Sequence, residues 1–391
     1  GLKNLTIIED TARLIETRHG EKKDPAAFPL DDAKTFELLQ RADTVGTFQL
    51  ESAGMRRYLK ELKPTELEDI ISMVALYRPG PMELIPEYVE RKHGRKPVRY
   101  LHPSLEPIFK NTYGIMIYQE QLMNAARTLA GLTLAEADVL RKAVGKKIRE
   151  LLQKQKEKLI SGCLKNGVSL AIAEEFWALI EPFDRYGFNR SHAASYATIA
   201  YQTAYLKTHY PVEYMTALLN SESADVERIA FVISEARRMG IKVLPPDLNA
   251  SDAGFVPEES NIRFGLAAIK NVGAAVVDAI VEERRRGGPY ESLGSFISRV
   301  QHKDVNKKTL ENLAKAGALD SLGVERNAVL HSMDELLRLG SALRRNRENA
   351  QTGLFGATPL RPVIRLASVA PAPAEERLAW EKELLGLYLT D

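Results

Sequence analysis

The feature that most limits the fold of this chain is a long series of helical segments separated by turn signals. From Pro29 to about Met239, apolar residues recur at helical spacing. Turn-forming residues break the pattern at "RPGPM" (78–82), "HPS" (102–104) and "HYP" (209–211). The sequence therefore predicts a mainly α fold whose largest part is a multi-helix domain.

The composition is that of an ordinary globular protein, with 45% apolar and 27% charged residues. Its 391 residues suggest two or three domains at roughly 150 residues each. The sequence has no apolar run of the roughly 20 residues that a membrane span needs. The single cysteine, Cys163, excludes an intrachain disulfide framework, so we expect a cytoplasmic protein with no membrane partner. Because the net charge is only +2, a nucleic-acid partner would have to meet local clusters of charge.

One predicted helix, over 133–165, is strongly basic. Thr133 and Glu136 have capping-box spacing at its start, and an apolar stripe runs from Leu140 to Cys163. Between Leu140 and Lys165 the chain has nine Lys or Arg and two Glu, a local net charge of +7. Lys142, Lys146 and Arg149 would project together if the helix continues through Gly145. Such a face is either a solvated helix surface or a phosphate-binding one.

Near Gly240 the pattern changes. The stretch 241–266 predicts a short strand pair that opens a small α+β module. The hairpin "KNVG" (270–273) then separates two apolar helical segments, which is helix-hairpin-helix spacing, and a second helical pair follows at 306–323. The hairpin is either an ordinary helix corner or a site where free backbone N–H groups hold a DNA phosphate. The "RRR" run at 284–286 favours DNA, and the Pro/Ala-rich stretch 365–376 predicts an irregular C-terminal linker.

The stretch "RYGFNRSHAASYA" (185–197) gathers many short-range hydrogen-bond donors before a helix. The sequence has no zinc-ligand spacing, no phosphate-binding P-loop, no nucleophile elbow and no Asp-x-Asp pair for two metal ions. Ser191 and His192 are adjacent and have no evident carboxylate to orient them, so we do not expect a nucleophile and base there. The residues indicate phosphate binding without phosphoryl-transfer chemistry of their own.

Several long strings in this order resemble the fingers region of bacterial DNA polymerase III alpha subunits, the C-family replicative polymerases. They are "TVGTFQLESAGMRRYL", "ALYRPGPM", "KHG", "YGIMIYQEQLM", "DVLRKAVGKK" and "YGFNRSHAASYATIAYQTAYLKTHYP". The later hairpins resemble the tandem helix-hairpin-helix region of that family. The resemblance implies four parts: the end of the palm domain and a connection (1–28), fingers (29–240), tandem helix-hairpin-helix motifs (241–330), and a helix and linker before an OB-fold (331–391).

The resemblance also implies a function: nucleotide and primer-template binding in a DNA-directed DNA polymerase. The opening "GLKNLTII" resembles the stretch after the last catalytic aspartate of the palm, so we expect the catalytic carboxylates and their Mg²⁺ outside this chain, and no activity from the chain alone. The alternative is a non-catalytic DNA-binding and clamp-adaptor module. Expected partners are primer-template DNA, deoxynucleoside triphosphates, the sliding clamp (beta) and other replicase subunits.

Site residues follow from the same resemblance. Arginine, lysine and histidine would reach the triphosphate, asparagine and serine would add neutral donors, and the aromatic residues would pack on the sugar and nascent base pair. The family often has a proline where this chain has Ile148, so the lysine that points inward is left open. The predicted nucleotide-binding residues are Arg78, Arg141, Lys142, Lys146, Tyr186, Phe188, Asn189, Arg190, Ser191 and His192; the DNA-binding residues are Lys270, Asn271, Val272, Gly273, Lys307 and Lys308.

A last motif lies in "NAQTGLFGA" (349–357). Gln351, Leu354 and Phe355 resemble the clamp-binding peptide of bacterial replication proteins, although Thr352 and Gly353 depart from its commoner pattern. Two large apolar side chains on an irregular segment can enter a pocket on a partner. The same string could be a loop that packs on its own domain.

Overall fold

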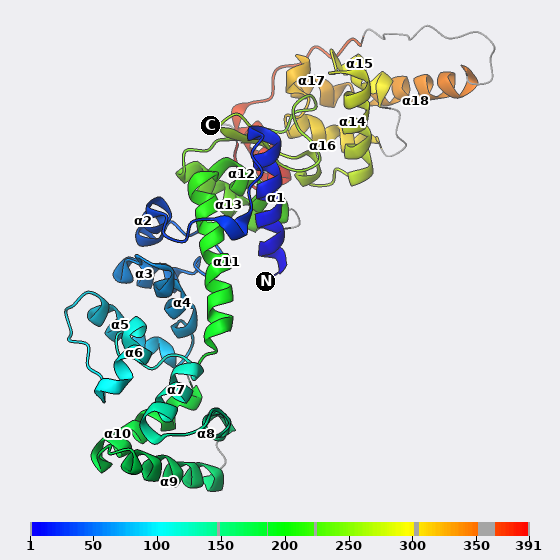
Figure 1. The fold of residues 1–391 in the computed structure, drawn as a ribbon. Coiled ribbons are helices and arrows are strands. Elements are labelled where there is room, and N and C mark those ends of the chain that lie inside the picture. Colours follow the sequence, from blue (N-terminus) through cyan, green and yellow to red (C-terminus); the bar gives the residue numbers. More distant parts are fainter. Residues whose placement is uncertain are drawn as a thin grey trace. The chain divides into compact units, whose positions relative to one another are not determined.

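The structure is a computed structural model that describes residues 2–146, 149–185, 187–222, 225–300, 305–350 and 364–389. The chain forms two compact units, the first from residues 1–5 and 23–209 and the second from 6–22 and 210–391. Helices dominate both units and the strands are short, which confirms the predicted mainly α fold with a small α+β module (Figure 1). Over these residues, no helix is both long and apolar enough to cross a membrane.

The first unit is all helical, and its helices begin where short polar side chains cap them. The Asp32 side chain accepts a hydrogen bond from the Thr35 N–H at 2.8 Å, and Ser52 caps the next helix in the same way. The helices are α2 (Ala33–Arg41), α3 (Ala53–Leu62), α4 (Leu67–Leu76), α5 (Ile85–Lys92), α6 (Glu106–Phe109), α7 (Gln119–Ala130), α8 (Leu134–Lys146), α9 (Arg149–Lys165), α10 (Leu170–Ile180) and α11 (Arg190–His209), with short 3₁₀ turns between several of them.

The long helix α11 packs against α2 and α4 through small residues (Figure 1). Ala193, Ala197, Ala200 and Ala204 follow helical spacing and are fully buried, so the backbones of the helices can approach closely. Tyr201 is also fully buried, and its hydroxyl donates to the Pro29 carbonyl at 2.7 Å. Tyr201 is therefore part of the core.

The second core of this unit corrects one prediction. The segment 133–165 is two helices, α8 and α9, which pack on each other and on α7. The Thr133 and Glu136 capping box is present, but Glu136 also binds Lys158 of α9 at 2.7 Å, which a single straight helix would not allow. Folding back buries both halves of the apolar stripe in one cluster with Leu140 and Cys163, whereas a straight helix would leave much of it in water. Arg149 therefore begins a different helix from Lys142.

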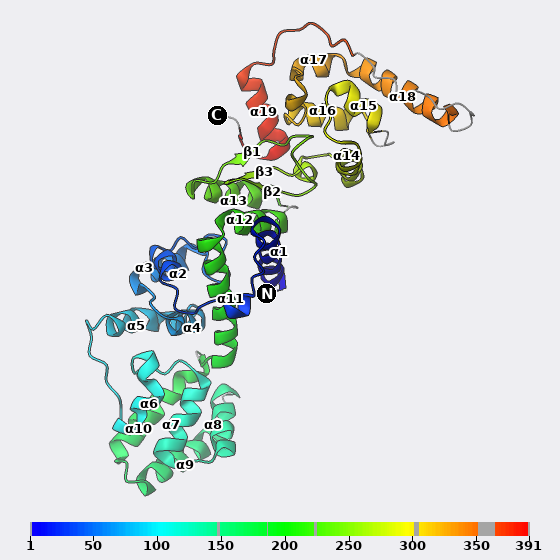
Figure 2. The same cartoon turned by 45° about the horizontal axis from the view of Figure 1, so that its top comes forward.

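The second unit combines helices with a small sheet. Strands β1 (Val243–Leu244), β3 (Asn261–Arg263) and β2 (Val256–Glu258) lie in that order, with β1 parallel and β2 antiparallel to β3, so the predicted strand pair has a third member. Helices α12 and α13 pack on this sheet (Figure 2). The helices of the unit are α1 (Leu2–His19, from Thr6 on), α12 (Pro211–Ser221), α13 (Val226–Arg238), α14 (Ala274–Gly287), α15 (Leu293–Arg299), α16 (Lys307–Lys315), α17 (Arg326–His331), α18 (Met333–Ala350) and α19 (Ala374–Leu385).

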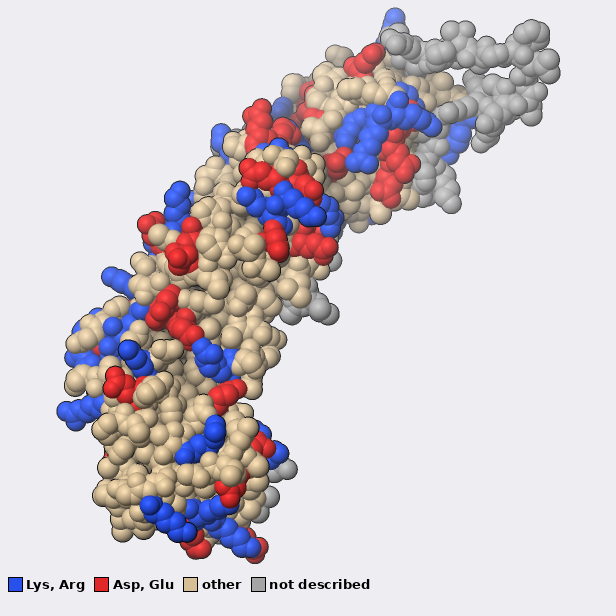
Figure 3. All heavy atoms as spheres, in the orientation of Figure 1, with Lys and Arg blue, Asp and Glu red and all other residues tan. Residues whose placement is uncertain are grey.

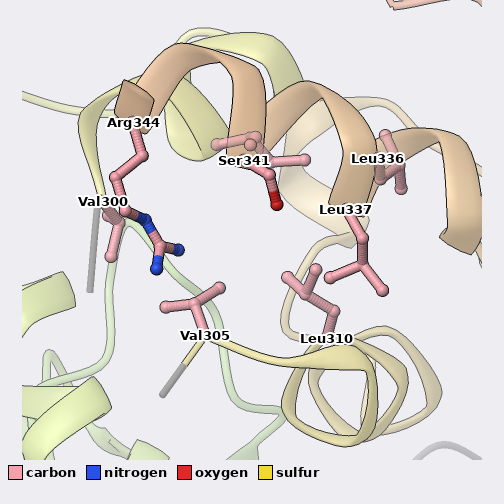
Figure 4. Close-up of a pocket in the computed structure, with 9 residues that line it drawn as sticks. Val300, Val305, Leu310, Leu336, Leu337, Ser341 and Arg344 are labelled. Atoms are coloured by element: carbon pink, nitrogen blue, oxygen red, sulfur yellow. The ribbon is translucent and has the colours of Figure 1, made fainter. Parts of the chain in front are cut away.

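A small gap remains where α18 packs on α15 and α16. Leu336 and Leu337 of α18 face Leu310 of α16, and Val300 and Val305 complete the wall (Figure 4). The gap measures about 40 Å³, far below the few hundred Å³ of a typical ligand pocket. It is a packing gap between these helices.

Candidate nucleotide and DNA interfaces

The stretch that opens with Arg185 leads into the first turn of α11. The helix begins at Arg190, so Ser191 and His192 lie in its first turn. Asn189 is the cap: its side-chain oxygen accepts from the His192 N–H at 2.8 Å and from the Ser191 hydroxyl at 2.6 Å. Backbone N–H groups at such a turn carry partial positive charge, which favours anions.

A short β-bridge fixes this turn to the start of α7. Tyr118 and Phe188 pair in parallel, and the Gln119 N–H donates to the Phe188 carbonyl at 2.9 Å. The Gln119 side chain also donates to the Gly187 carbonyl at 3.2 Å. Gly187 is required here, because a Cβ on it would lie 2.5 Å from the Phe183 ring. The loop before α11 is therefore held closely to α7.

The three predicted arginines, Arg78, Arg141 and Arg190, lie at the loop before α11 and the start of α7. The Arg78 guanidinium lies 4.4 Å from the centroid of the Phe188 ring. Arg141 donates to the Gln119 side-chain oxygen at 3.3 Å, and Arg190 lies 5.9 Å from the centroid of the Tyr118 ring. Although they are far apart in sequence, these side chains contact residues 118–119 and 188, which the β-bridge holds together. We call Arg78, Arg141 and Arg190 the arginine cluster.

Burial and ion pairs shift the pKa values of charged groups in this region. Burial lowers the pKa of Arg78 below its ordinary value, although a guanidinium stays charged at neutral pH. Asp138 binds both Arg141, at 2.8 Å, and Lys142, at 2.7 Å. Hydrogen bonds from Lys142 and then Arg141 hold the pKa of the Asp138 carboxyl below its usual range. Tyr186 and the side chain of Lys146 lie outside the described part of the chain.

Two further predicted residues, Phe188 and His192, form a partly exposed aromatic surface with Tyr196. The His192 ring lies 4.3 Å from that of Tyr196 and 5.5 Å from that of Phe188, centroid to centroid. His192 and Ser191 are exposed, and Phe188 is half-buried. Aromatic rings beside cationic groups suit a nucleotide, which combines a planar base with phosphates.

Two carboxylates at this site were not predicted from the sequence. Glu120 accepts from the Arg190 N–H and from the Asn189 side-chain amide, each at 3.0 Å. Glu68 pairs with the Arg190 guanidinium. Glu120 lies within "YQEQ", a string that marks the family resemblance, but nothing local to it reveals a partner 69 residues away.

In the second unit, the "KNVG" hairpin leads directly into α14. Asn271 has a positive φ of 61°, which makes the tight turn, and Val272 is buried beneath it. Gly273 is the cap residue; within the described chain no side chain caps α14, and its first turn has no acidic residue. Lys270, Asn271 and Gly273 are exposed. The predicted hairpin thus presents a helix N-terminus whose N–H groups face solvent.

Other basic residues of this unit are less available than the sequence suggests. Arg284 donates to the carbonyls of Leu248 and Ser251 and pairs with Asp252 at 2.7 Å, so it stabilises the fold. Positive and negative side chains lie next to each other over α14 (Figure 3). At α16, Lys307 pairs with Asp334 at 3.1 Å, while Lys308 is exposed. Asn312 of α16 donates to the Lys270 carbonyl at 3.2 Å, which links this helix to the hairpin.

Two predicted features have no structural test here. Gln351, Leu354 and Phe355 lie outside the described residues. In the described ranges, no three or more His, Cys, Asp or Glu residues are grouped so that they could hold a metal ion.

The chain is similar to known proteins along its whole length. Residues 4–167 match the family model of the bacterial DNA polymerase III alpha subunit finger domain, and residues 240–329 match that of a helix-hairpin-helix motif. The chain is 46% identical to DNA polymerase III subunit alpha of Thermus aquaticus, and 44% identical to those of Chlamydia trachomatis and Bacillus subtilis. Each match covers the whole chain but only 32%, 32% and 35% of the relative, so the chain spans about a third of these proteins.

Proposed function

Because the chain belongs to the family of bacterial DNA polymerase III alpha subunits, we propose that it is the nucleotide-binding and DNA-binding part of a replicative DNA polymerase. In this proposal the first turn of α11 and the arginine cluster bind the triphosphate of an incoming deoxynucleotide. The aromatic surface of Phe188, His192 and Tyr196 packs against its sugar and base.

The convergence of the arginine cluster on the bridged residues 118–119 and 188 is the observation that carries this proposal. A triphosphate bears several negative charges, and its transfer moves further charge onto the leaving pyrophosphate. Cations that approach from several sides, fixed in place beforehand, stabilise such charge best. Arg78, Arg141 and Arg190 come from three helical regions and contact the same pair of segments, 118–120 and 187–190. We place the catalytic carboxylates and their Mg²⁺ elsewhere in the full-length polymerase.

Kinetics of an Arg190→Ala variant of the full-length polymerase tests this role. Loss of one charge-stabilising donor should weaken transition-state stabilisation by about 2–4 kcal/mol. The kcat/KM for nucleotide incorporation should fall accordingly. The control is Arg57→Ala, which removes an exposed arginine whose partner is Glu61 on the same helix. An unchanged kcat/KM in Arg190→Ala would refute the assignment.

The hairpin and its helix suit the second part of the function, binding of the DNA backbone. The start of α14 has no side-chain cap from the described residues. Lys270 in the hairpin is exposed, and so is Lys308 in α16, the helix that contacts the hairpin. The N–H groups of the helix start and these two lysines can hold phosphates without reading bases. Such binding weakens steeply as the salt concentration rises. If the arginine cluster proves unnecessary for incorporation while this binding persists, the chain is instead the non-catalytic DNA-binding and clamp-adaptor module.

The clamp remains part of the proposal because of the motif at Gln351, Leu354 and Phe355. Each large apolar side chain contributes roughly 1.5–3 kcal/mol when it is buried in a partner. A tether to a ring around DNA raises the effective concentration of the polymerase on its template. We expect the chain to bind the sliding clamp, and Leu354→Ala with Phe355→Ala to abolish that binding. Unchanged affinity would show that the motif packs on its own domain.

A further inference from the structure

The nucleotide site contains its own anions. The Glu120 carboxylate occupies the first turn of α11, where it accepts the N–H of Arg190 at 3.0 Å. Its other oxygen accepts from the Asn189 amide, also at 3.0 Å. These are the donors that the proposed function assigns to a phosphate. The two carboxylate oxygens bind them much as two phosphate oxygens would.

A second carboxylate neutralises the guanidinium of the same residue. Glu68 on α4 pairs with Arg190 through Oε1. Its Oε2 is buried and accepts no hydrogen bond from the residues that the structure describes. A buried carboxylate oxygen without a donor is costly, because it has lost water without replacing it. The Glu68 contact is therefore incompletely satisfied, which makes it easier to exchange.

We propose that Glu120, assisted by Glu68, competes with the triphosphate for the first turn of α11 and so sets the affinity of the site for nucleotide and pyrophosphate. This inference rests on the function proposed above. The two carboxylates occupy the donors when no ligand is bound. A triphosphate displaces them because it also reaches Arg78 and Arg141, and they return when pyrophosphate leaves.

The competition has a measurable consequence, because each ligand must displace the same carboxylate. The free energy of that displacement reduces the affinity for nucleotide and for pyrophosphate by one common factor. Removing the negative charge of Glu120 should therefore tighten both ligands equally. A carboxylate that only supports the helix turn would have the opposite effect when removed.

The experiment uses the full-length polymerase with primer-template DNA. Single-turnover incorporation gives the Kd of the nucleotide and the maximum rate, and inorganic pyrophosphate is titrated as an inhibitor. In Glu120→Gln we expect the nucleotide Kd to fall roughly two- to fivefold, the range expected for one charge at a helix N-terminus. The inhibition constant of pyrophosphate should fall by the same factor. The matched control, Glu61→Gln, removes a carboxylate that pairs with Arg57 on α3 and should change neither constant.

Glu68→Gln provides a second variant with the same expected direction, and it decides the matter if Glu120→Gln does not fold. An unchanged or larger Kd in the folded variants would overturn the competition and assign these carboxylates to support of α11. The proposed function would still stand in that case if Arg190→Ala and Arg141→Ala weaken nucleotide binding. If those arginine variants also leave the Kd unchanged, the triphosphate binds elsewhere and the proposed function itself fails.

Discussion

Substitution of Gly273 by aspartate should stabilise the second unit and weaken its binding to DNA. Gly273 caps α14 with φ −72° and ψ 143°, a conformation that any residue adopts, and a Cβ on it would meet no atom within 4 Å. An aspartate can therefore take the cap position without strain and accept a hydrogen bond from the first turn. Cap and helix-dipole effects together predict a gain of about 0.5–1 kcal/mol in the free energy of unfolding.

The same carboxylate would take the place of a DNA phosphate. Loss of one phosphate contact lowers the slope of log K against log salt by about 0.9. With the added repulsion between like charges, roughly 1 kcal/mol at close range in water, duplex affinity at low salt should fall about tenfold or more.

Denaturant unfolding measures the stability of Gly273→Asp, and fluorescence anisotropy with a labelled duplex at several salt concentrations measures its binding. Gly273→Asn is the control, because asparagine also caps a helix but carries no charge. It should keep part of the stability gain and most of the affinity. Equal duplex affinity and salt slope for the two variants would refute the argument that α14 binds phosphate through its N-terminus.

Three further predictions concern stability and activity. Hydrogen bonds from Lys158 and then from Thr133 lower the pKa of Glu136 to about 2, so its stabilising effect is fully present above its ordinary pKa of 4.5 and is lost as the pH falls toward 2. Glu136→Gln should therefore lower the free energy of unfolding at pH 7 but not near pH 2, and an equal loss at both values would exclude the linkage. In Gly162→Ala the new Cβ would lie 2.3 Å from the Ala130 carbonyl oxygen, which predicts a loss of about 1–3 kcal/mol, while Gly340→Ala in α18 meets only Ile297 at 3.6 Å and should gain about 0.5–1 kcal/mol. Both are measured by denaturant unfolding, and similar values for the two would contradict the packing argument. Purified chain alone should extend no primer at any Mg²⁺ concentration, and measurable extension would mean that catalytic residues lie within it.

Local features of this chain were predictable because a few neighbouring residues determine them. The hairpin at 270–273 follows from an asparagine in the left-handed region and a buried valine beside it. The capping box of Thr133 and Glu136 likewise needs only residues three apart. The break between α8 and α9 was not predictable in this way, since the apolar stripe continues through it. The chain folds back there because α8 and α9 pack on each other and on α7, which is tertiary packing.

The candidate nucleotide site likewise combines features that were predictable from the sequence with features that only tertiary packing determines. Residue types and a family resemblance indicated the arginine cluster, but the carboxylate partners of Arg190 depend on tertiary structure. Glu68 and Arg190 are 122 residues apart, and Glu120 and Arg190 are 70 apart. No periodic pattern links residues at such distances, so the sequence did not show the anions that pair with Arg190.

The two helix N-termini of the proposed function differ in a way that suits their ligands. The first turn of α11 already binds the carboxylate of Glu120, whereas the first turn of α14 has no acidic residue. An occupied turn exchanges one anion for another, so it can bind a triphosphate and release pyrophosphate in each cycle without holding either too tightly. An open turn binds any phosphate that reaches it, and its affinity depends mainly on salt. That behaviour fits a DNA backbone, along which the same contact must form at every position.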